Sequence, residues 1–239
     1  MRRAGIGVLW IFLLTFLLLG VPRLSGVIAS FFDYQTIDPD GAFAWITVHH
    51  LVQAAIFLIM IFCLSSFKQL DFGLGWGIKD VGKKYVVRFT LIFGLGSLAS
   101  HVLVILTGSF QAFPYPLSAG NIIGQMGFQL FLSGPSEELI FRAFAITMLA
   151  LVIRGRILNG KVSLANLFAA VIFGLAHVGF SFAPIALRYD PFQVILSIIL
   201  GLFYGDCYEK TNSVYYPMIM HSISNVLMVG FTTIATWIQ

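Results

Sequence analysis

The stretch SGPSEELIFRAF, residues 133–144, places Glu137, Glu138 and Arg142 in the middle of a long apolar segment. A charged side chain at the centre of a membrane helix costs about 2.5–3.5 kcal/mol on insertion scales. Three such charges acting independently would cost about 8–10 kcal/mol, which is comparable to the stability of a whole domain. We therefore expect all three to face a protein or water-filled interior and to have partners there.

The composition of the whole chain indicates that a bilayer surrounds this stretch. Of the 239 residues, 59% are hydrophobic and only 10% are charged, whereas an ordinary soluble domain is about 45–50% apolar and about 25% charged. The net charge of +4 comes from short basic clusters between apolar runs, which are typical of membrane loops rather than of a nucleic-acid-binding face. The sequence therefore predicts an integral, multi-pass membrane protein surrounded by membrane lipids, with no nucleic-acid partner.

A membrane crossing needs about 20 apolar residues, and this criterion predicts an all-α bundle of about seven transmembrane helices. Their approximate ranges are 4–21, 46–67, 86–107, 122–152, 163–185, 191–208 and 214–236. The fourth range is too long for one straight helix, so we expect it to tilt or to break near Gly134 and Pro135. The length of the first apolar run favours a retained helix over a cleaved signal peptide.

Lys and Arg alternate between the two sides of these predicted spans. They gather at the N-terminus and in the second and fourth connections, at Arg2, Arg3, Lys68, Lys79, Lys83, Lys84, Arg88, Arg154, Arg156 and Lys161. By the positive-inside rule, this alternation predicts a cytoplasmic N-terminus. The short N-terminus and the compact loops favour a prokaryotic cell membrane.

The three charges of the opening stretch differ in their local partners. Glu138 and Arg142 are four residues apart on one helical face, so we expect a structural ion pair. Glu137 lies about 100° around the same helix and has no local cation. Pro135 is favoured at the first position of a helix, which would put Glu137 in the first turn, where the helix dipole stabilises a carboxylate. Glu137 is therefore a candidate general base.

Two further apolar segments each carry a histidine with a second notable residue four positions away. They hold Phe173 and His177 in VIFGLAH, and His221 and Asn225 in MIMHSISNVLM. Each has a structural explanation by itself, since buried histidines are often structural and Asn often joins membrane helices. Together with Glu137 they form a set that could activate a water and stabilise an oxyanion. The remaining histidines are expected to be interfacial or structural: His49, His50 and His101.

Several familiar signatures of membrane-embedded hydrolysis are missing from the sequence. It contains neither H-E-x-x-H nor G-x-S-x-G, so the usual zinc helix and the usual serine nucleophile are not indicated. Ser133 and Ser136 flank a proline and are interpreted as helix-start residues. Asp190 and Asp206 fall in predicted connections rather than in spans, which argues against an aspartyl intramembrane protease.

Three motifs, in their order along the chain, resemble those of the CPBP family. This family comprises the type II CAAX prenyl endopeptidases and the bacteriocin-processing or immunity proteins, also called Abi proteins. The motifs are E-E-x-x-x-R at Glu137, Glu138 and Arg142, F-x-x-x-H at Phe173 and His177, and H-x-x-x-N at His221 and Asn225. The resemblance covers residues 122–229 and departs at Ala143, where many members have Gly. We accordingly divide the chain into N-terminal transmembrane helices over 1–121, about three spans without a matching motif, and a CPBP/Abi-like catalytic core over 122–236.

The resemblance implies an intramembrane endopeptidase with a catalytic cavity and a peptide or lipidated protein as substrate. Glu137 would be the catalytic Glu and would activate water together with His177. His221 and Asn225 would stabilise the tetrahedral oxyanion. The residues implied to orient or support this site are Glu138, Arg142 and Phe173.

The sequence leaves the cofactor, the substrate and one alternative function open. No cofactor is firmly implied, although a divalent metal such as zinc could be held by Glu137, His177 and His221 in a site with one open position. The substrate could be a prenylated CAAX protein, a bacteriocin leader or a signalling peptide. The alternative function is a non-proteolytic membrane scaffold or bacteriocin-immunity protein of the same fold. A proton-relay transporter is disfavoured because the sequence shows no internal repeat.

Overall fold

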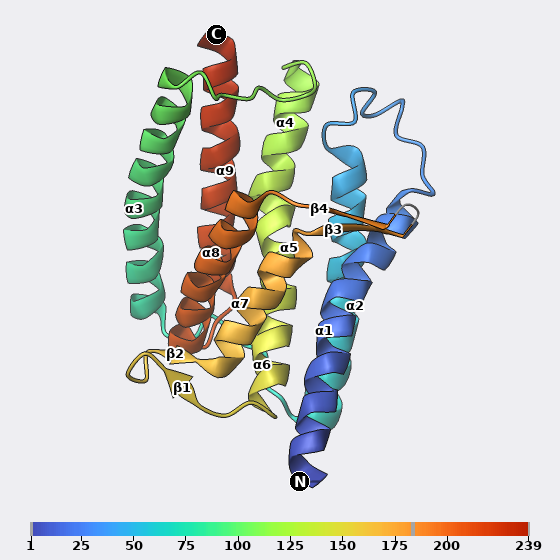
Figure 1. Ribbon diagram of the computed structural model, residues 1–239, viewed down its shortest axis with the longest axis vertical. Coiled ribbons are helices and arrows are strands. Elements are labelled where there is room, and N and C mark those ends of the chain that lie inside the picture. Colours follow the sequence, from blue (N-terminus) through green and yellow to red (C-terminus); the bar gives the residue numbers. More distant parts are fainter. Residues whose placement is uncertain (1, 183–184, 239) are drawn as a thin grey trace.

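The long apolar runs of the sequence form long helices, because a backbone in lipid must satisfy its own N–H and C=O groups. The computed structural model describes residues 2–182 and 185–238. Among these residues, five helices are long and apolar enough to cross a membrane. They are α1 (Arg2–Ala29, apolar from Gly7), α2 (Ala44–Lys68), α3 (Lys79–Leu106), α8 (Pro191–Thr211) and α9 (Tyr215–Ile238). The helices run up and down one long axis, with the N-terminus at the lower end and the C-terminus at the upper end (Figure 1).

The predicted span at 122–152 is a helical run from Ala119 to Ala150 that changes its hydrogen-bonding pattern along its length. Its pieces are α4 (Ala119–Phe128), η1 (Gln129–Ser133), α5 (Gly134–Glu138), η2 (Leu139–Phe144) and α6 (Ala145–Ala150), of which η1 and η2 are π-helical. Pro135 has no N–H to donate to the preceding turn, and it closely follows η1. The expected break is therefore a change of helix type on both sides of α5, and such π-helical segments are frequent at functional sites.

The predicted span at 163–185 is wrong over its described residues; residues 183–184 lie outside them. Helix α7 (Leu164–Ala176) has only 13 residues, about 20 Å, which is too short for a hydrocarbon core of about 30 Å. The chain then forms β3 (Gly179–Phe182), which pairs antiparallel with β4 (Ile185–Arg188). Five helices of the described residues meet the criterion for a membrane span, so the seven predicted spans are not confirmed. A short apolar run does not distinguish a strand from a helix by its periodicity, which explains the error.

Two short hairpins also depart from the predicted all-α fold, although the protein is mostly helical. The first pairs β1 (Arg156–Ile157) with β2 (Val162–Ser163) and joins α6 to α7. The second, β3–β4, extends sideways from the top of α7 toward α1 (Figure 1). Beside this second hairpin, Arg23 of α1 donates a hydrogen bond to the carbonyl of Val178 at 3.3 Å.

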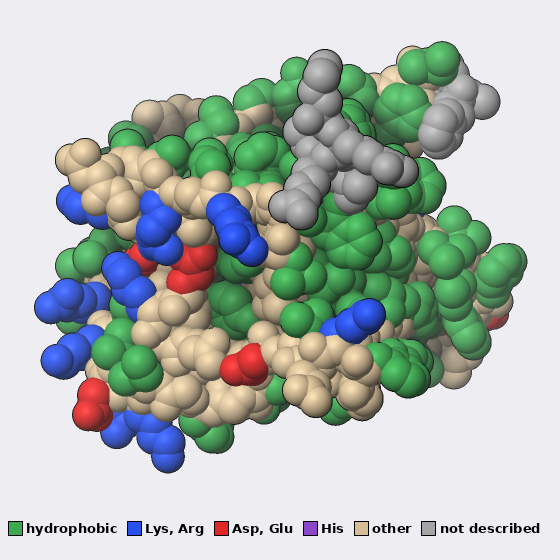
Figure 2. Space-filling model, turned by 90° about the horizontal axis from the view of Figure 1, so that it is seen from below, with side chains coloured by type: hydrophobic (Ala, Val, Ile, Leu, Met, Phe, Trp, Pro, Cys, Tyr) green, Lys and Arg blue, Asp and Glu red, His purple; other side chains and the backbone are tan. Residues whose placement is uncertain are grey.

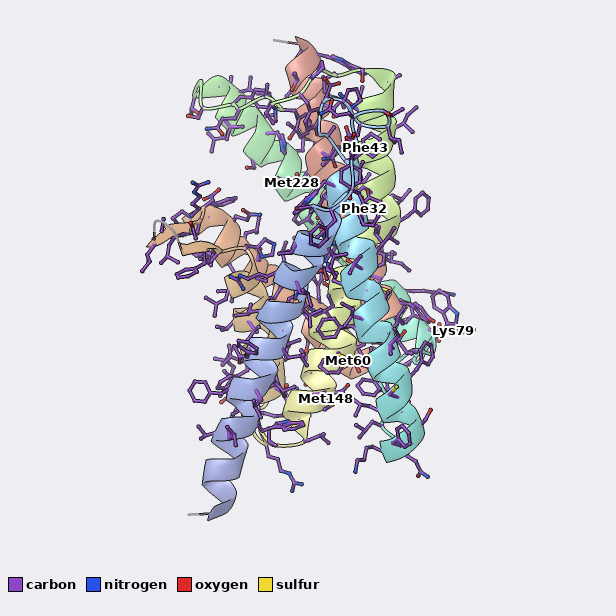
Figure 3. The ribbon with its side chains drawn as sticks, turned by 90° about the vertical axis from the view of Figure 1, so that its right-hand side faces the viewer. Phe32, Phe43, Met60, Lys79, Met148 and Met228 are labelled. Carbon is purple, nitrogen blue, oxygen red and sulfur yellow. The ribbon has the colours of Figure 1, made fainter. Side chains whose placement is uncertain are left out.

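One apolar core joins the first two helices to the central run. Leu18 of α1 and Phe57 of α2 are fully buried in the same cluster as Phe144 of η2. Met60 of α2 and Met148 of α6 belong to the same packing in the lower half of the molecule (Figure 3). Burying such side chains contributes about 1.5–3 kcal/mol each, so the N-terminal helices are part of the same folding unit as the run from α4 to α6.

Helix α9 lies between α3 and the run from α4 to α6, and it approaches α5 very closely (Figure 1). A Cβ atom on Gly134 would lie 2.9 Å from the backbone nitrogen of Ser222 and 3.0 Å from Cβ of His221. Such contacts are too short for ordinary packing, so only glycine lets the two helices meet here. This approach brings the residues that follow Gly134 next to His221.

Most of the basic side chains gather at the lower end of the bundle. Viewed from below, Lys and Arg lie mainly on the side where α3 begins and where the β1–β2 hairpin turns (Figure 2). The connections that carry them are those predicted to lie on one side of the membrane. The assignment of this end to the cytoplasm stays a prediction.

The loop before α2 is organised by the buried carboxylate of Asp38. It accepts hydrogen bonds from the N–H groups of Ala42, Phe43 and Ala44 at 2.8, 2.7 and 2.6 Å. Burial opposes ionisation of this carboxyl, but the three N–H donors hold the pKa of Asp38 below its ordinary value of 3.8. Because the pKa of Asp38 is lower in the folded protein than in the unfolded chain, the ionised carboxylate stabilises the fold at any pH above its unfolded pKa. This stabilisation is lost as the pH falls through the folded pKa.

We expect Asp38→Ala to lower the stability of the protein by about 1–2 kcal/mol at neutral pH, because three N–H groups lose their acceptor. The difference from wild type should shrink in acid, where Asp38 itself becomes protonated. Thermal unfolding in detergent at neutral and acid pH measures both effects. Asp33→Ala is the control, because Asp33 is exposed and accepts, within the described part of the chain, one hydrogen bond, from Gln35 N–H at 3.0 Å. Equal losses in the two variants would contradict the role of Asp38.

Candidate functional site

The two adjacent carboxylates of α5 have different surroundings. The Glu138 side chain is fully buried, whereas 18% of the Glu137 side chain is exposed. The ion pair expected at Glu138 is present, with Nε of Arg142 2.8 Å from Oε2 and Nη2 3.2 Å from Oε1. Both side chains have 0% exposed surface. Water therefore cannot solvate either charge if its partner is removed.

Aromatic rings from two other helices cover the Arg142 guanidinium. Its Cζ atom lies 4.7 Å from the ring centroid of Phe173 on α7 and 5.6 Å from that of Tyr204 on α8. These are cation–π distances, so the rings stabilise the desolvated cation. Arg142 thereby fixes the positions of α7 and α8 relative to η2.

His221 of α9 is held by the same group of residues. Its Nδ1 lies 2.8 Å from Oε1 of Glu138, and its ring stacks on Tyr204 with centroids 5.1 Å apart. The Tyr204 hydroxyl lies 2.9 Å from Oγ of Ser224. Glu138 is paired with Arg142 and can only accept, so Nδ1 of His221 carries the hydrogen of this bond. The other ring nitrogen, Nε2, faces Oε2 of Glu137 at 3.7 Å.

The second oxygen of Glu137 faces a histidine that the motifs do not include. Nε2 of His50 on α2 lies 3.8 Å from Oε1 of Glu137. The buried His50 ring is held by Ser136, whose Oγ lies 2.6 Å from Nδ1, and by Gln53, whose Nε2 lies 3.1 Å from Nδ1. His50, expected to be interfacial, is buried where α2 packs against α5. A signal in the sequence is the pair His50 and Gln53, two polar residues three apart in an apolar helix.

His177 joins this group through Phe173. It directly follows the last residue of α7, and its Nδ1 lies 2.9 Å from the carbonyl oxygen of Phe173. The two rings pack edge to face with centroids 5.0 Å apart, and Phe173 in turn packs against His221 at 5.9 Å. A carbonyl accepts only, so Nδ1 donates this bond and Nε2 of a neutral His177 is free to accept a proton.

Asn225 is bonded to a residue interpreted from the sequence as a helix start. Its Nδ2 donates to Oγ of Ser133 at 3.0 Å. Ser133 does not cap α5 with its side chain, so that interpretation is wrong. The helix is already continuous there and leaves no free turn to cap. Direct contacts thus join Glu138, Arg142 and His221, and Glu137 lies against them.

The predicted catalytic cavity is not confirmed. Three hollows lie along α3, and none of them is lined by Glu137, His177 or His221. Within residues 2–182 and 185–238, no three His, Cys, Asp or Glu side chains are grouped closely enough to hold a metal ion. The zinc site considered from the sequence therefore stays a prediction.

Comparison with known protein families gives a match over the central and C-terminal part of the chain. Residues 119–227 match the family model described as type II CAAX prenyl endopeptidase Rce1-like. This range begins at the first residue of α4 and includes every site residue predicted from the three motifs, whereas His50 lies outside it. No curated protein and no solved structure matches the chain.

We expect Arg142→Met to lower the stability of the protein by about 3–5 kcal/mol, because Glu138 would be left buried without its cation. Lys210→Met is the matched control. Lys210 also pairs with an acid four residues earlier, Asp206, at 2.9 Å, but 53% of its side chain is exposed. Its loss should cost less than about 1 kcal/mol. Thermal unfolding in detergent measures the difference, and similar losses in both variants would refute the importance of burial.

Proposed function

We propose that this membrane protein hydrolyses a peptide bond with a water activated by Glu137, in keeping with the match of residues 119–227 to the type II CAAX prenyl endopeptidase Rce1-like family model. The observation that carries the proposal is the position of Glu137. Its partly exposed carboxylate lies between Nε2 of His50 and Nε2 of His221, at 3.8 and 3.7 Å. Glu138, by contrast, is neutralised by Arg142 and closed off from the surface.

The proposed reaction begins with Glu137 as the general base. Glu137 and His177 orient a water, and Glu137 takes its proton as the oxygen attacks the carbonyl carbon of the substrate. The separations of 3.7 and 3.8 Å exceed a hydrogen bond, so a bridging water would connect Glu137 to the two imidazoles.

Asn225 and His221 are proposed to stabilise the oxyanion that forms. Nδ1 of His221 is engaged by Glu138, so the ring donates to the oxyanion from Nε2 after it receives the proton collected by Glu137. When the tetrahedral intermediate collapses, the C–N bond breaks and this proton passes to the leaving nitrogen. The water has then given one hydrogen to the amine, and its oxygen remains in the new carboxyl group.

The substrate class follows from the family and from the apolar surroundings of the site. A peptide or prenylated protein in the membrane would bring its scissile bond to Glu137 without leaving the bilayer. The N-terminus and the basic lower end are proposed to lie in the cytoplasm, since Lys and Arg side chains gather at that end (Figure 2).

We expect Glu137→Gln to lower the rate of cleavage at least about 100-fold, because the amide keeps the shape of the side chain but is no base. Mass spectrometry of membranes from cells producing the wild type or the variant would reveal the lost products. Glu209→Gln is the control, since this glutamate pairs with exposed Arg156 at 3.4 Å and lies outside the site. Cleavage by the Glu137→Gln variant at the wild-type rate would exclude Glu137 as the base.

We also expect cleavage to continue after metal ions are removed. The reason is that the proposed steps use only Glu137, His177, His221 and Asn225. The purified protein would be dialysed against a chelator and tested on a farnesylated CAAX peptide, with metal content measured in parallel. Loss of activity that returns when zinc is added back would overturn the glutamate-type mechanism in favour of a metallopeptidase.

A further inference from the structure

An apolar groove of about 520 Å³ lies between α3, α8 and α9, away from Glu137. On α3 its wall runs from Val81 to Phe93 along one helical face, a distance of about 18 Å. Most of the wall is apolar, and it includes Phe89 and Ile92 of α3 and Phe203 of α8. Ile92 and Phe203 are 75% and 57% exposed, so the groove is open along the outer surface of the bundle, where lipid would lie.

The groove has a cationic end. Lys84 and Arg88 line it one turn apart on α3, and both are exposed. Neither forms an ion pair with a carboxylate of the described residues. Asp206 also lines the groove, but it accepts from Lys210 at 2.9 Å and from the Tyr85 hydroxyl at 2.5 Å. Lys210 thus already balances the negative charge of Asp206, so Lys84 and Arg88 give this end of the groove a net positive charge.

This cationic end lies at the level where a bilayer interface is expected. Trp76, just before α3, packs on Tyr215 with ring centroids 4.7 Å apart and is 53% exposed. Aromatic rings of this kind favour the headgroup region. Lys79, at the start of α3 (Figure 3), and Lys83 line a second hollow beside Trp76. The apolar part of the groove therefore lies toward the hydrocarbon and its cations toward the headgroups.

We propose that this groove binds an anionic phospholipid. The phosphate contacts Lys84 and Arg88, and one acyl chain lies along Phe89, Ile92 and Phe203. Charge complementarity selects a lipid with net negative charge, because basic pockets between membrane helices attract acidic headgroups. The site does not depend on the proposed peptidase activity, since none of the proposed catalytic residues lines it.

The experiment compares two lipids and two pairs of charge changes. Native mass spectrometry of the full chain in detergent would measure binding of phosphatidylglycerol and of phosphatidylcholine. A Lys or Arg near an acidic headgroup strengthens binding about fivefold, so Lys84→Gln/Arg88→Gln should weaken phosphatidylglycerol binding about 25-fold. Phosphatidylcholine binding should change little. Arg154→Gln/Lys161→Gln removes the same charge from the same end, outside the groove, and should change neither.

A second pair of variants tests the apolar part. Ile92→Trp narrows the groove and should weaken binding of phosphatidylglycerol, whereas Leu91→Trp places the same ring on α3 outside the lining and should not. Both positions are exposed, at 75% and 61%, so neither change disturbs the core. Equal loss from the two charge pairs, or equal effects of the two tryptophans, would overturn the proposal. If inorganic phosphate fully displaced phosphatidylglycerol, the occupant would be a free phosphate instead of a lipid. If the wild type formed a dimer and the Ile92→Trp variant did not, the occupant would be a second copy of the chain.

Discussion

The buried ion pair between Glu138 and Arg142 is the interaction on which the rest of the structure depends. Two charges without water are tolerable only if each finds the other and if further groups satisfy what remains of their polarity. Here three helices supply the surroundings: the rings of Phe173 on α7 and Tyr204 on α8 cover the guanidinium, and His221 on α9 bonds Glu138. Nη1 of Arg142 has no hydrogen-bond partner among the described residues. A pair that is local in sequence thus determines how three distant segments pack around it.

The same pair separates the roles of two neighbouring glutamates. Glu138 is used to hold Arg142 and Nδ1 of His221, which leaves Glu137 facing His50 and His221 without a cation of its own. The π-helical segments before and after α5 change the angle between successive side chains relative to an α-helix. Gly134 adds the close approach of α9, so the backbone of this short stretch positions both carboxylates.

The sequence predicts those features that follow from the bilayer or from helical spacing. The positions of five long helices follow from the length of apolar runs, and the pairing of Glu138 with Arg142 follows from their spacing of four. The end of α7 at Ala176 was missed because an apolar strand and an apolar helix share their composition. Ser133 was misassigned because its partner, Asn225, is 92 positions away in the chain. Such contacts depend on tertiary packing, which no local pattern encodes.

His50 shows why the motif-bearing part of the chain is not the whole site. The family match begins at residue 119, yet one oxygen of Glu137 faces a ring that comes from α2. Leu18 of α1 and Phe57 of α2 are buried in the same core as Phe144, so removing the first two helices would open the core around Phe144. The division at residue 121 therefore describes where the motifs lie, whereas the physical unit that holds Glu137 in place includes α1 and α2 as well.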